Sequence, residues 1–256
     1  MKVPDWNDSK GVMDEKTSYE ISYAVITSIG ERKTNEDAYG ILELPDKKYF
    51  LVCDGLGGHG DGEVASSFVV ETMKQCLAEG LSVADSIMKS QNQLLEKQRQ
   101  EHKESGMKTT LTCLEIKDEK AKFSYVGDSR IYWFEKNKYK LRTKDHSVPQ
   151  MLVNSGAIKE KDIRHHEDRS RLLRVMGTQW NTPKYQIMDE FDISAKSSFL
   201  LCTDGFWELI EEKEMGMCLK KSRSPKEWLS SMEQIIRQNG KGTNMDNYTA
   251  IAVFVR

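Results

Sequence analysis

Runs of β-branched and aromatic residues, bounded by polar turn formers, recur along the chain and predict strands. Residues 19–29 read YEISYAVITSI and residues 48–53 read KYFLVC. Two further runs, SFLLC at 198–202 and YTAIAVFV at 248–255, have the same character. Because such side chains fit a pleated, half-buried surface, each run is typical of a strand.

The segment between Lys108 and Arg142 contains four such runs in close succession. They read TTLTCLEI, AKFSYV, RIYWFE and KYKLR, and short turn-forming sequences separate them. Strands joined by tight turns ordinarily pair with their neighbours along the chain. The segment therefore predicts an antiparallel meander.

Apolar residues at helical spacing predict four helices. In residues 62–79 they recur every three to five positions, which marks one face of a helix. A second helix follows with Ser82 as its N-cap, and a third spans 148–154 behind the cap Ser147. Residues 225–238 form the fourth. Because strands come in runs and helices in pairs, the predicted fold class is α+β with antiparallel sheets.

Composition and charge narrow the possible functions. The 256 residues carry 38 Lys and Arg against 40 Asp and Glu, a net charge of −2. A general nucleic-acid binder needs a basic surplus, so this balance disfavours that class. No apolar stretch reaches membrane-spanning length, and the polar leader at residues 1–18 lacks the apolar core of a signal peptide. We expect a cytoplasmic protein without membrane or nucleic-acid partners, with a single domain over residues 19–256.

The five cysteines are candidate nucleophiles, so their spacing matters. A cysteine phosphatase needs Cys-x5-Arg to hold a phosphate above its thiolate, and none of the five has Arg six positions on. No two have CxxC spacing, and four stand in apolar runs. We predict free, buried cysteines that act as small hydrophobic residues.

Acidic residues stand where apolar strands meet turns. Asp54 follows LVC, Asp204 follows LLCT, Asp246 precedes the last strand, and the pair Glu36-Asp37 follows the first. Each alone is an ordinary turn former. Together, carboxylates crowded at strand ends repel one another unless a cation lies between them. Oxygen ligands without Cys or His select hard cations, so the pattern predicts Mg²⁺ or Mn²⁺.

Two such cations suit the hydrolysis of a phosphoester. They can share a carboxylate, polarise a phosphoryl oxygen and lower the pKa of a bridging water towards neutrality. Asp54 is the best candidate for the shared carboxylate, because Gly55 lets its backbone carbonyl approach the same ion. Arg32 has the guanidinium geometry to hold the phosphate with two hydrogen bonds, and the alternative is a plain surface arginine.

The glycines at residues 55–60 admit a second interpretation. GLGGHG formally matches GxGxxG, follows a predicted strand and precedes a predicted helix, as in dinucleotide-binding folds. However, that helix runs into another helix rather than into a second parallel strand. Asp54 would also point a negative charge at the pyrophosphate. The dinucleotide interpretation is therefore the weaker one.

Taken in order, these motifs resemble the type 2C metal-dependent serine/threonine protein phosphatases in their compact bacterial form. The resemblance runs from about residue 21 to the C-terminus. Its segments are Arg32-x-x-Asn35-Glu36-Asp37, Asp54-Gly55-Leu56-Gly57-Gly58-His59 with Gly62-Glu63-Val64-Ala65, Thr109-Thr110-Leu111, Val126-Gly127-Asp128-Ser129-Arg130, Asp145-His146-Ser147, Leu200-Leu201-Cys202-Thr203-Asp204-Gly205 and Asp246-Asn247-Tyr248-Thr249.

The resemblance implies a four-layer α/β/β/α sandwich with two central antiparallel sheets and metals at one end. It implies that two Mn²⁺ or Mg²⁺ ions are bound by Asp54, the Gly55 carbonyl, Asp204 and Asp246, with Asp37 or Glu36 contacting a metal directly or through another ligand. The implied reaction is hydrolysis of phosphoserine or phosphothreonine by attack of a metal-bridging water or hydroxide. The implied partners are phosphorylated proteins, substrates of a Ser/Thr kinase.

Three positions depart from the family pattern. Leu56 stands where many members carry a histidine thought to protonate the leaving group, so that role is vacant. Lys108 precedes Thr109 where a glycine is usual. Glu208 replaces the aspartate that, with Asp128, would hold a third metal, and its extra methylene predicts a looser third site.

Residues around 145–183 are expected to form a flap over the active site. Arg164, His165, His166 and Arg169 lie in it as candidate contacts to a phosphoprotein, and a merely solvated surface is the alternative. A zinc site is disfavoured, because adjacent histidines splay apart and no cysteine lies nearby. The rival function for the whole chain is a catalytically silent, phosphatase-like partner-binding module. The presence of all the expected acids argues against it.

Overall fold

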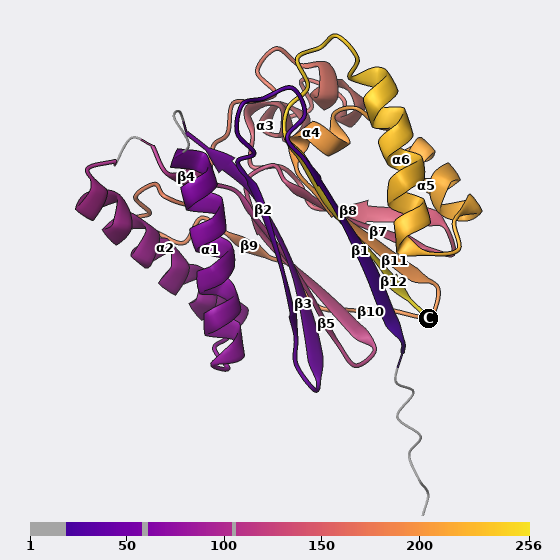
Figure 1. The fold of residues 1–256 in the computed structure, drawn as a ribbon, viewed down its shortest axis with the longest axis horizontal. Helices are drawn as coiled ribbons and strands as arrows, with labels where there is room; N and C mark the ends of the chain where they lie inside the picture. Colours follow the sequence, from indigo (N-terminus) through magenta and orange to yellow (C-terminus); the bar gives the residue numbers. More distant parts are fainter. Residues whose placement is uncertain (1–18, 58–60, 104–105) are drawn as a thin grey trace, which may run out of the picture.

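Two antiparallel sheets packed face to face form the centre of the molecule, and a pair of helices covers each outer face (Figure 1). The computed structural model describes residues 19–57, 61–103 and 106–256. The predicted α+β, four-layer α/β/β/α sandwich is thereby confirmed. The predicted leader at residues 1–18 lies outside the described residues, and the single-domain reading of 19–256 stays a prediction.

The strands of each sheet come from distant parts of the chain. The first sheet has the order β1 (Ile21–Ser28), β12 (Tyr248–Val255), β11 (Ser197–Cys202), β7 (Arg130–Glu135) and β8 (Lys138–Arg142). The second has the order β10 (Phe191–Asp192), β6 (Lys120–Val126), β5 (Leu111–Lys117), β3 (Lys47–Leu56) and β2 (Asp37–Glu43), with β4 (Lys108–Thr109) on β3 and β9 (Gln186–Ile187) on β6.

Two of the helices, α2 (Val83–Glu101) and α3 (Val148–Asn154), begin behind the caps that the sequence predicts. The others are α1 (Asp61–Ala78), α4 (Asp204–Trp207), α5 (Glu212–Lys221) and α6 (Pro225–Asn239), with a 3₁₀ helix at Glu160–His165. The Ser82 hydroxyl accepts the Asp85 N–H at 3.1 Å, and Ser147 likewise caps α3. Helices α4 and α5 and the 3₁₀ helix have no counterpart among the four helices that the sequence predicts.

Alternation along the strands divides the core into three layers. In β3, Leu51 faces α1 and α2, while Phe50 and Val52 face the other sheet. In β12, Ala252 faces α5 and α6 and Val253 faces the other sheet. Both faces of each central strand are therefore buried, which explains the nearly continuous apolar runs. All five cysteines are buried and free, as predicted.

The predicted four-stranded meander is wrong at its centre. Strand β5 pairs with β6 and β7 pairs with β8, but β6 and β7 belong to different sheets. The chain crosses between the sheets at Gly127, whose φ of +102° is a conformation that favours glycine. The chain does change direction where the sequence predicts a turn, but this turn connects strands of two different sheets rather than two paired strands. It places Asp128 at the end of the sandwich.

Candidate metal centre

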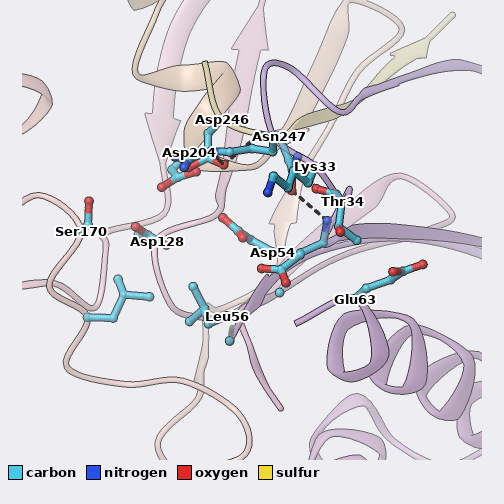
Figure 2. A pocket seen from close by; sticks show the side chains of 15 residues that line it. Lys33, Thr34, Asp54, Leu56, Glu63, Asp128, Ser170, Asp204, Asp246 and Asn247 are labelled. Atoms are coloured by element: carbon cyan, nitrogen blue, oxygen red, sulfur yellow. Dashed lines mark hydrogen bonds and ion pairs between the residues drawn. The ribbon is translucent and has the colours of Figure 1, made fainter. Parts of the chain in front are cut away.

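The acids singled out by the sequence lie at one end of the sandwich, where strands of both sheets end. Asp37 and Asp54 are register partners on β2 and β3. Asp204 begins α4 directly after β11, and Asp246 lies two residues before β12. Asp128 lies in the crossing between β6 and β7. Figure 2 shows four of them, all but Asp37, around one pocket.

This pocket has a volume of about 820 Å³. Its walls come from the turn after β1, the end of β3, the start of α1, the β6–β7 crossing, residues 145–183 (the predicted flap), the start of α4 and the segment before β12. The lining residues are Arg32, Lys33, Thr34, Glu36, Asp54, Gly55, Leu56, Gly57, Glu63, Asp128, Ser170, Leu172, Asp204, Asp246 and Asn247.

Two glycines let the acid-bearing segments approach one another closely. A Cβ at Gly55 would lie 2.2 Å from the carbonyl oxygen of Gly62 and 2.5 Å from that of Glu36. A Cβ at Gly205 would lie 2.1 Å from the carbonyl oxygen of Asn247. Any side chain at either position would push these segments apart. The Asp-Gly pairs therefore assemble the acidic cluster as well as forming turns.

Four of these carboxyl groups have raised pKa values. Burial, followed by repulsion from neighbouring acids, raises the pKa of Asp54 and of Asp128 well above the ordinary range. Burial also raises the pKa of Asp37 to about 8, against the opposing hydrogen bond from the Thr203 hydroxyl, and that of Asp204 to about 7. In the described part of the chain none of these four carboxylates is ion-paired with a Lys or Arg.

The donor set fits hard divalent cations. Carboxylate and backbone oxygens line the pocket, and the described lining includes no Cys or His. In the part of the chain that the structure describes, no three or more His, Cys, Asp or Glu side chains are grouped closely enough to hold a metal ion by themselves. A hard divalent cation at this pocket would therefore take backbone oxygens and waters besides carboxylates. Crowded acids with raised pKa values supply the electrostatic reason for binding a cation there.

Arg32 lies at the rim of the pocket and pairs with Asp246. Its Nε lies 3.0 Å from one carboxylate oxygen of Asp246, and its Nη2 lies 2.8 Å from the other. The side chains are 44% and 46% exposed, so a pair of this kind contributes at most about 1 kcal/mol. The guanidinium thus holds a carboxylate that the resemblance assigns to a metal. Because the ion pair is weak, a cation can replace the guanidinium beside Asp246 at little cost in free energy.

Asn247 fixes the loop between β1 and β2, a role that the sequence analysis missed. Its side-chain oxygen accepts the Glu36 N–H at 2.8 Å, and its Nδ2 donates to the carbonyls of Ile29 and Thr34 at 2.8 and 3.0 Å. The only signal in the sequence was its place next to Asp246. This amide holds the loop that carries the predicted Glu36 ligand.

Glu36 itself lines the pocket, together with Glu63, which the sequence analysis left without a role. Burial, then repulsion from Asp246 and Glu63, raises the pKa of Glu36. Its backbone carbonyl accepts the Gly55 N–H at 3.0 Å, so the loop and the end of β3 are joined directly. Glu36 therefore lies at the pocket beside the other acids, and its contact with a metal stays a prediction.

The predicted third-site pair is held together by Trp207. Its indole Nε1 donates to the carbonyl oxygen of Asp128 at 3.0 Å. Glu208 follows it as the C-cap of α4, and burial raises the pKa of its carboxyl group. The Glu208 carboxylate accepts a hydrogen bond from the Nε of Arg169 at 3.0 Å. A flap residue thus contacts one of the two acids.

The flap contributes other residues to the pocket than those the sequence singled out. Ser170 and Leu172 line it. His165 and His166 do not, and the Nδ1 of His166 accepts the Asp168 N–H at 3.1 Å instead. No zinc-binding group forms around these histidines in the described residues.

The expectation that Arg164 contacts substrate is contradicted by its position. Its guanidinium donates to the carbonyl of Trp207 and, at 2.6 Å, to a carboxylate oxygen of Glu212. The side chain is only 8% exposed, so its charge does not reach the pocket surface. Arg164 and Arg169 stand in the same basic segment, and only the fold shows that one points inward and the other outward.

The strand pairing is also inconsistent with a dinucleotide site. After β3 the chain forms α1 and α2 and returns in β5, which pairs antiparallel with β3. The parallel strand that a dinucleotide fold requires does not occur among the described pairs.

Acids at one end of a two-sheet sandwich flanked by helix pairs define a class of metal-dependent phosphatases. The family described as protein phosphatase 2C matches residues 27–247. The chain belongs to this family and is a metal-dependent protein serine/threonine phosphatase. Among the helices of the described residues, none combines the length and apolar character needed to cross a membrane.

Named relatives and solved structures agree with this assignment. The serine/threonine phosphatase stp of Listeria welshimeri is 31% identical over 233 residues, 87% of this chain and 90% of the relative. The phosphatase Stp1 of Staphylococcus aureus is similar in structure, with a TM-score of 0.78 at 27% identity over 94% of this chain and 96% of that one. The catalytic domain of PstP, solved with two manganese ions, has the same fold, with a TM-score of 0.78 at 22% identity over 93% and 99% of the two chains.

Proposed function

We propose that this chain hydrolyses phosphoserine and phosphothreonine in proteins with the help of two Mn²⁺ or Mg²⁺ ions held by Asp54, the Gly55 carbonyl, Asp204 and Asp246. The observation that carries the proposal is the cluster of aspartates with raised pKa values around one pocket. Such a cluster is unfavourable when ionised and becomes favourable when cations neutralise it. When bound, the cations supply polarisation of a phosphoryl oxygen and a water of lowered pKa.

The chain's own residues orient the substrate. Arg32 releases Asp246 and turns its two donors to the phosphate, a planar bidentate contact that guanidinium makes well. Asp37 lies beside Asp54 in the sheet and keeps it in place through the paired strands. Leu56 lines the pocket, and its aliphatic side chain cannot donate a proton to the leaving group. The proton for the leaving alkoxide then comes from solvent.

The proposed substrates are phosphorylated proteins, the products of a Ser/Thr kinase. Ser170 and Leu172 of the flap border the pocket and are placed to contact the chain on either side of the phosphoresidue. His165, His166 and Arg169 belong to the same segment but do not line the pocket. These flap contacts set the choice of substrate, whereas the acids perform the chemistry.

A Mn²⁺ titration of the purified full chain tests this function. Hydrolysis of p-nitrophenyl phosphate and of a phosphothreonine peptide is expected only with Mn²⁺ or Mg²⁺ present, with saturation by two ions per chain in calorimetry. Metal binding without hydrolysis of either substrate would instead identify a catalytically silent binding module. Hydrolysis that persists in excess chelator would exclude the metal-dependent reaction.

We further propose that Asp128 and Glu208 hold a third, weaker cation. Asp128→Ala and Glu208→Ala are expected to lower turnover while calorimetry still counts two tightly bound ions. Unchanged turnover in Asp128→Ala would leave this residue only the role of turn former. Loss of a tightly bound ion in either variant would move that residue into the two-metal centre.

A further inference from the structure

A second groove lies away from the metal centre, between α5 and the hairpin of β7 and β8, which are neighbours in Figure 1. Its volume is about 430 Å³. Asn137, Lys138 and Tyr139 form one side, and Lys213, Gly216, Met217 and Lys220 form the other, with Glu212 at one end. Strand β8 ends its sheet, so the groove runs beside a sheet edge.

The helix side of the groove is a single stripe interrupted by a glycine. Lys213, Gly216, Met217 and Lys220 have the spacing of one helical face. A Cβ at Gly216 would lie 3.5 Å from the Asn137 carbonyl oxygen and 3.8 Å from a ring carbon of Phe134, both ordinary contacts. The packing therefore does not require glycine, which costs about 1 kcal/mol against alanine inside a helix. Because Gly216 has no side chain, it leaves a hollow between Lys213, Met217 and Lys220 on this face of the helix.

The hollow is bordered by apolar side chains left in solvent. Tyr139 is 40% exposed on the hairpin side, and Met217 is 49% exposed on the helix side. They are two of the few large hydrophobic side chains that the described surface exposes, and they face the same groove. An exposed apolar depression of this kind marks a binding site more often than a lone exposed residue does.

The rim of the groove carries uncompensated positive charge. Lys138, Lys213 and Lys220 line it, and no described carboxylate lies within ion-pair distance of their ammonium groups. The one acid in the lining, Glu212, accepts the Arg164 guanidinium at 2.6 Å and is thereby neutralised. Three lysines around an apolar hollow fit a negatively charged ligand with an apolar part.

We propose that this groove docks an acidic segment of a partner protein, with one apolar side chain over Gly216 and carboxylates facing the three lysines. Strand β7 runs from the metal end at Arg130 to Glu135 beside the groove, a span of roughly 17 Å at 3.3 Å per residue. A docked segment therefore leaves the phosphate pocket open. This surface brings a partner to the enzyme and takes no part in the hydrolysis itself.

Fluorescence anisotropy with the full chain and a labelled peptide, Asp-Glu-Glu-Phe-Glu-Asp-Asp, tests the proposal. Saturable binding is expected, weakened about threefold by Lys213→Glu or Lys220→Glu and about tenfold by both together, whereas Lys241→Glu, an exposed lysine outside the groove, has no effect. A peptide with Ser in place of Phe should bind at least fivefold more weakly. Mn²⁺-dependent hydrolysis of p-nitrophenyl phosphate should stay at the wild-type rate in all of these variants.

Gly216→Ala separates docking from folding. It should raise the melting temperature, because alanine favours the helix and its Cβ meets no close atom, and yet weaken peptide binding by filling the hollow. Binding that is equal in wild type and the double lysine variant overturns the proposal, as does equal binding of the Ser peptide. A dimer in sedimentation that the double lysine variant disperses also overturns it, since a second copy would then cover the groove.

Discussion

Two buried aspartates at the same end of the sandwich have opposite surroundings. Asp128 is 4% exposed and Asp145 is 5% exposed. The Asp145 carboxylate accepts Nε and Nη2 of Arg130 at 2.8 and 2.7 Å, and Arg142 approaches it at 3.2 Å. Burial alone would raise the pKa of Asp145, but the two guanidinium groups lower it below its usual value. The pKa of Asp128 is raised well above the ordinary range.

The contrast separates an acid whose charge the chain itself compensates from one whose charge it does not. In the folded protein the chain itself supplies the cations for Asp145, the guanidinium groups of Arg130 and Arg142. Asp128, like Asp54 and Asp204, is buried close to other acids, so its charge is relieved only by a proton or by a cation from solution. Burial is common to both, and only the sign of the neighbouring charge differs. Asp→Asn substitutions should therefore act in opposite ways on the two groups.

The largest effect is expected from Asp54→Asn. Activity on p-nitrophenyl phosphate should fall at least about 10³-fold at saturating Mn²⁺, because the shared ligand is lost. The melting temperature of the metal-free variant should hold or rise, since one repelling charge is gone. Asp204→Asn should behave alike. Near-normal turnover by either variant would refute the two-metal assignment.

Asp145→Asn should instead lower the stability of the fold. It removes the carboxylate that the buried guanidinium groups of Arg130 and Arg142 share, and breaking a buried pair typically costs about 3–5 kcal/mol. Arg142 keeps its ion pair with Glu160 at 2.8 Å and Arg130 has Glu212 at 4.0 Å, so we expect the lower end of that range. Urea denaturation of the metal-free protein measures it. The matched comparison is Asp128→Asn under the same conditions, and a loss of similar size in both variants would abolish the distinction between the two acids.

The pH dependence of stability should reveal the unpaired acids. Folded pKa values of about 8 for Asp37 and about 7 for Asp204 mean that the folded protein keeps protons which the unfolded chain has lost by pH 6.5. Folding then takes up protons, so the metal-free protein should lose stability as the pH rises from 6.5 to 8. Added Mn²⁺ should raise the melting temperature more at pH 8 than at pH 6.5, because protons compete with it. The opposite order in calorimetric scans would contradict these shifts.

Arg32→Ala should give the smallest effect on metal binding and a clear one on substrate. The KM for p-nitrophenyl phosphate should rise more than kcat falls, since ground and transition states both carry the phosphate charge. Mn²⁺ affinity should hold or rise by no more than about fivefold, because the exposed pair with Asp246 is worth about 1 kcal/mol at most. Arg32→Lys is the matched control for charge. Loss of Mn²⁺ binding in Arg32→Ala would make Arg32 a support of the loop rather than a phosphate ligand.

Much of the candidate site was readable in the sequence because each acid is tied to a local signal. Asp54 and Asp204 end apolar strand runs and precede glycines, and both properties depend only on neighbouring residues. The caps Ser82 and Ser147 were predictable for the same reason, since an N-cap bonds within its own first turn. The type and order of most elements followed likewise.

What the sequence by itself determined, then, is the chemistry of the donor set and the local elements that carry it. Only the tertiary structure decided which sheet each of β6 and β7 joins, because the turn at Gly127 is compatible with either pairing. It also decided which charges are paired. Arg164 faces inward to Glu212, and Asp145 receives the arginines that Asp128 lacks. Such ion pairs join residues that lie apart in the chain. The sequence next to a charged residue does not indicate which partner the fold will bring to it.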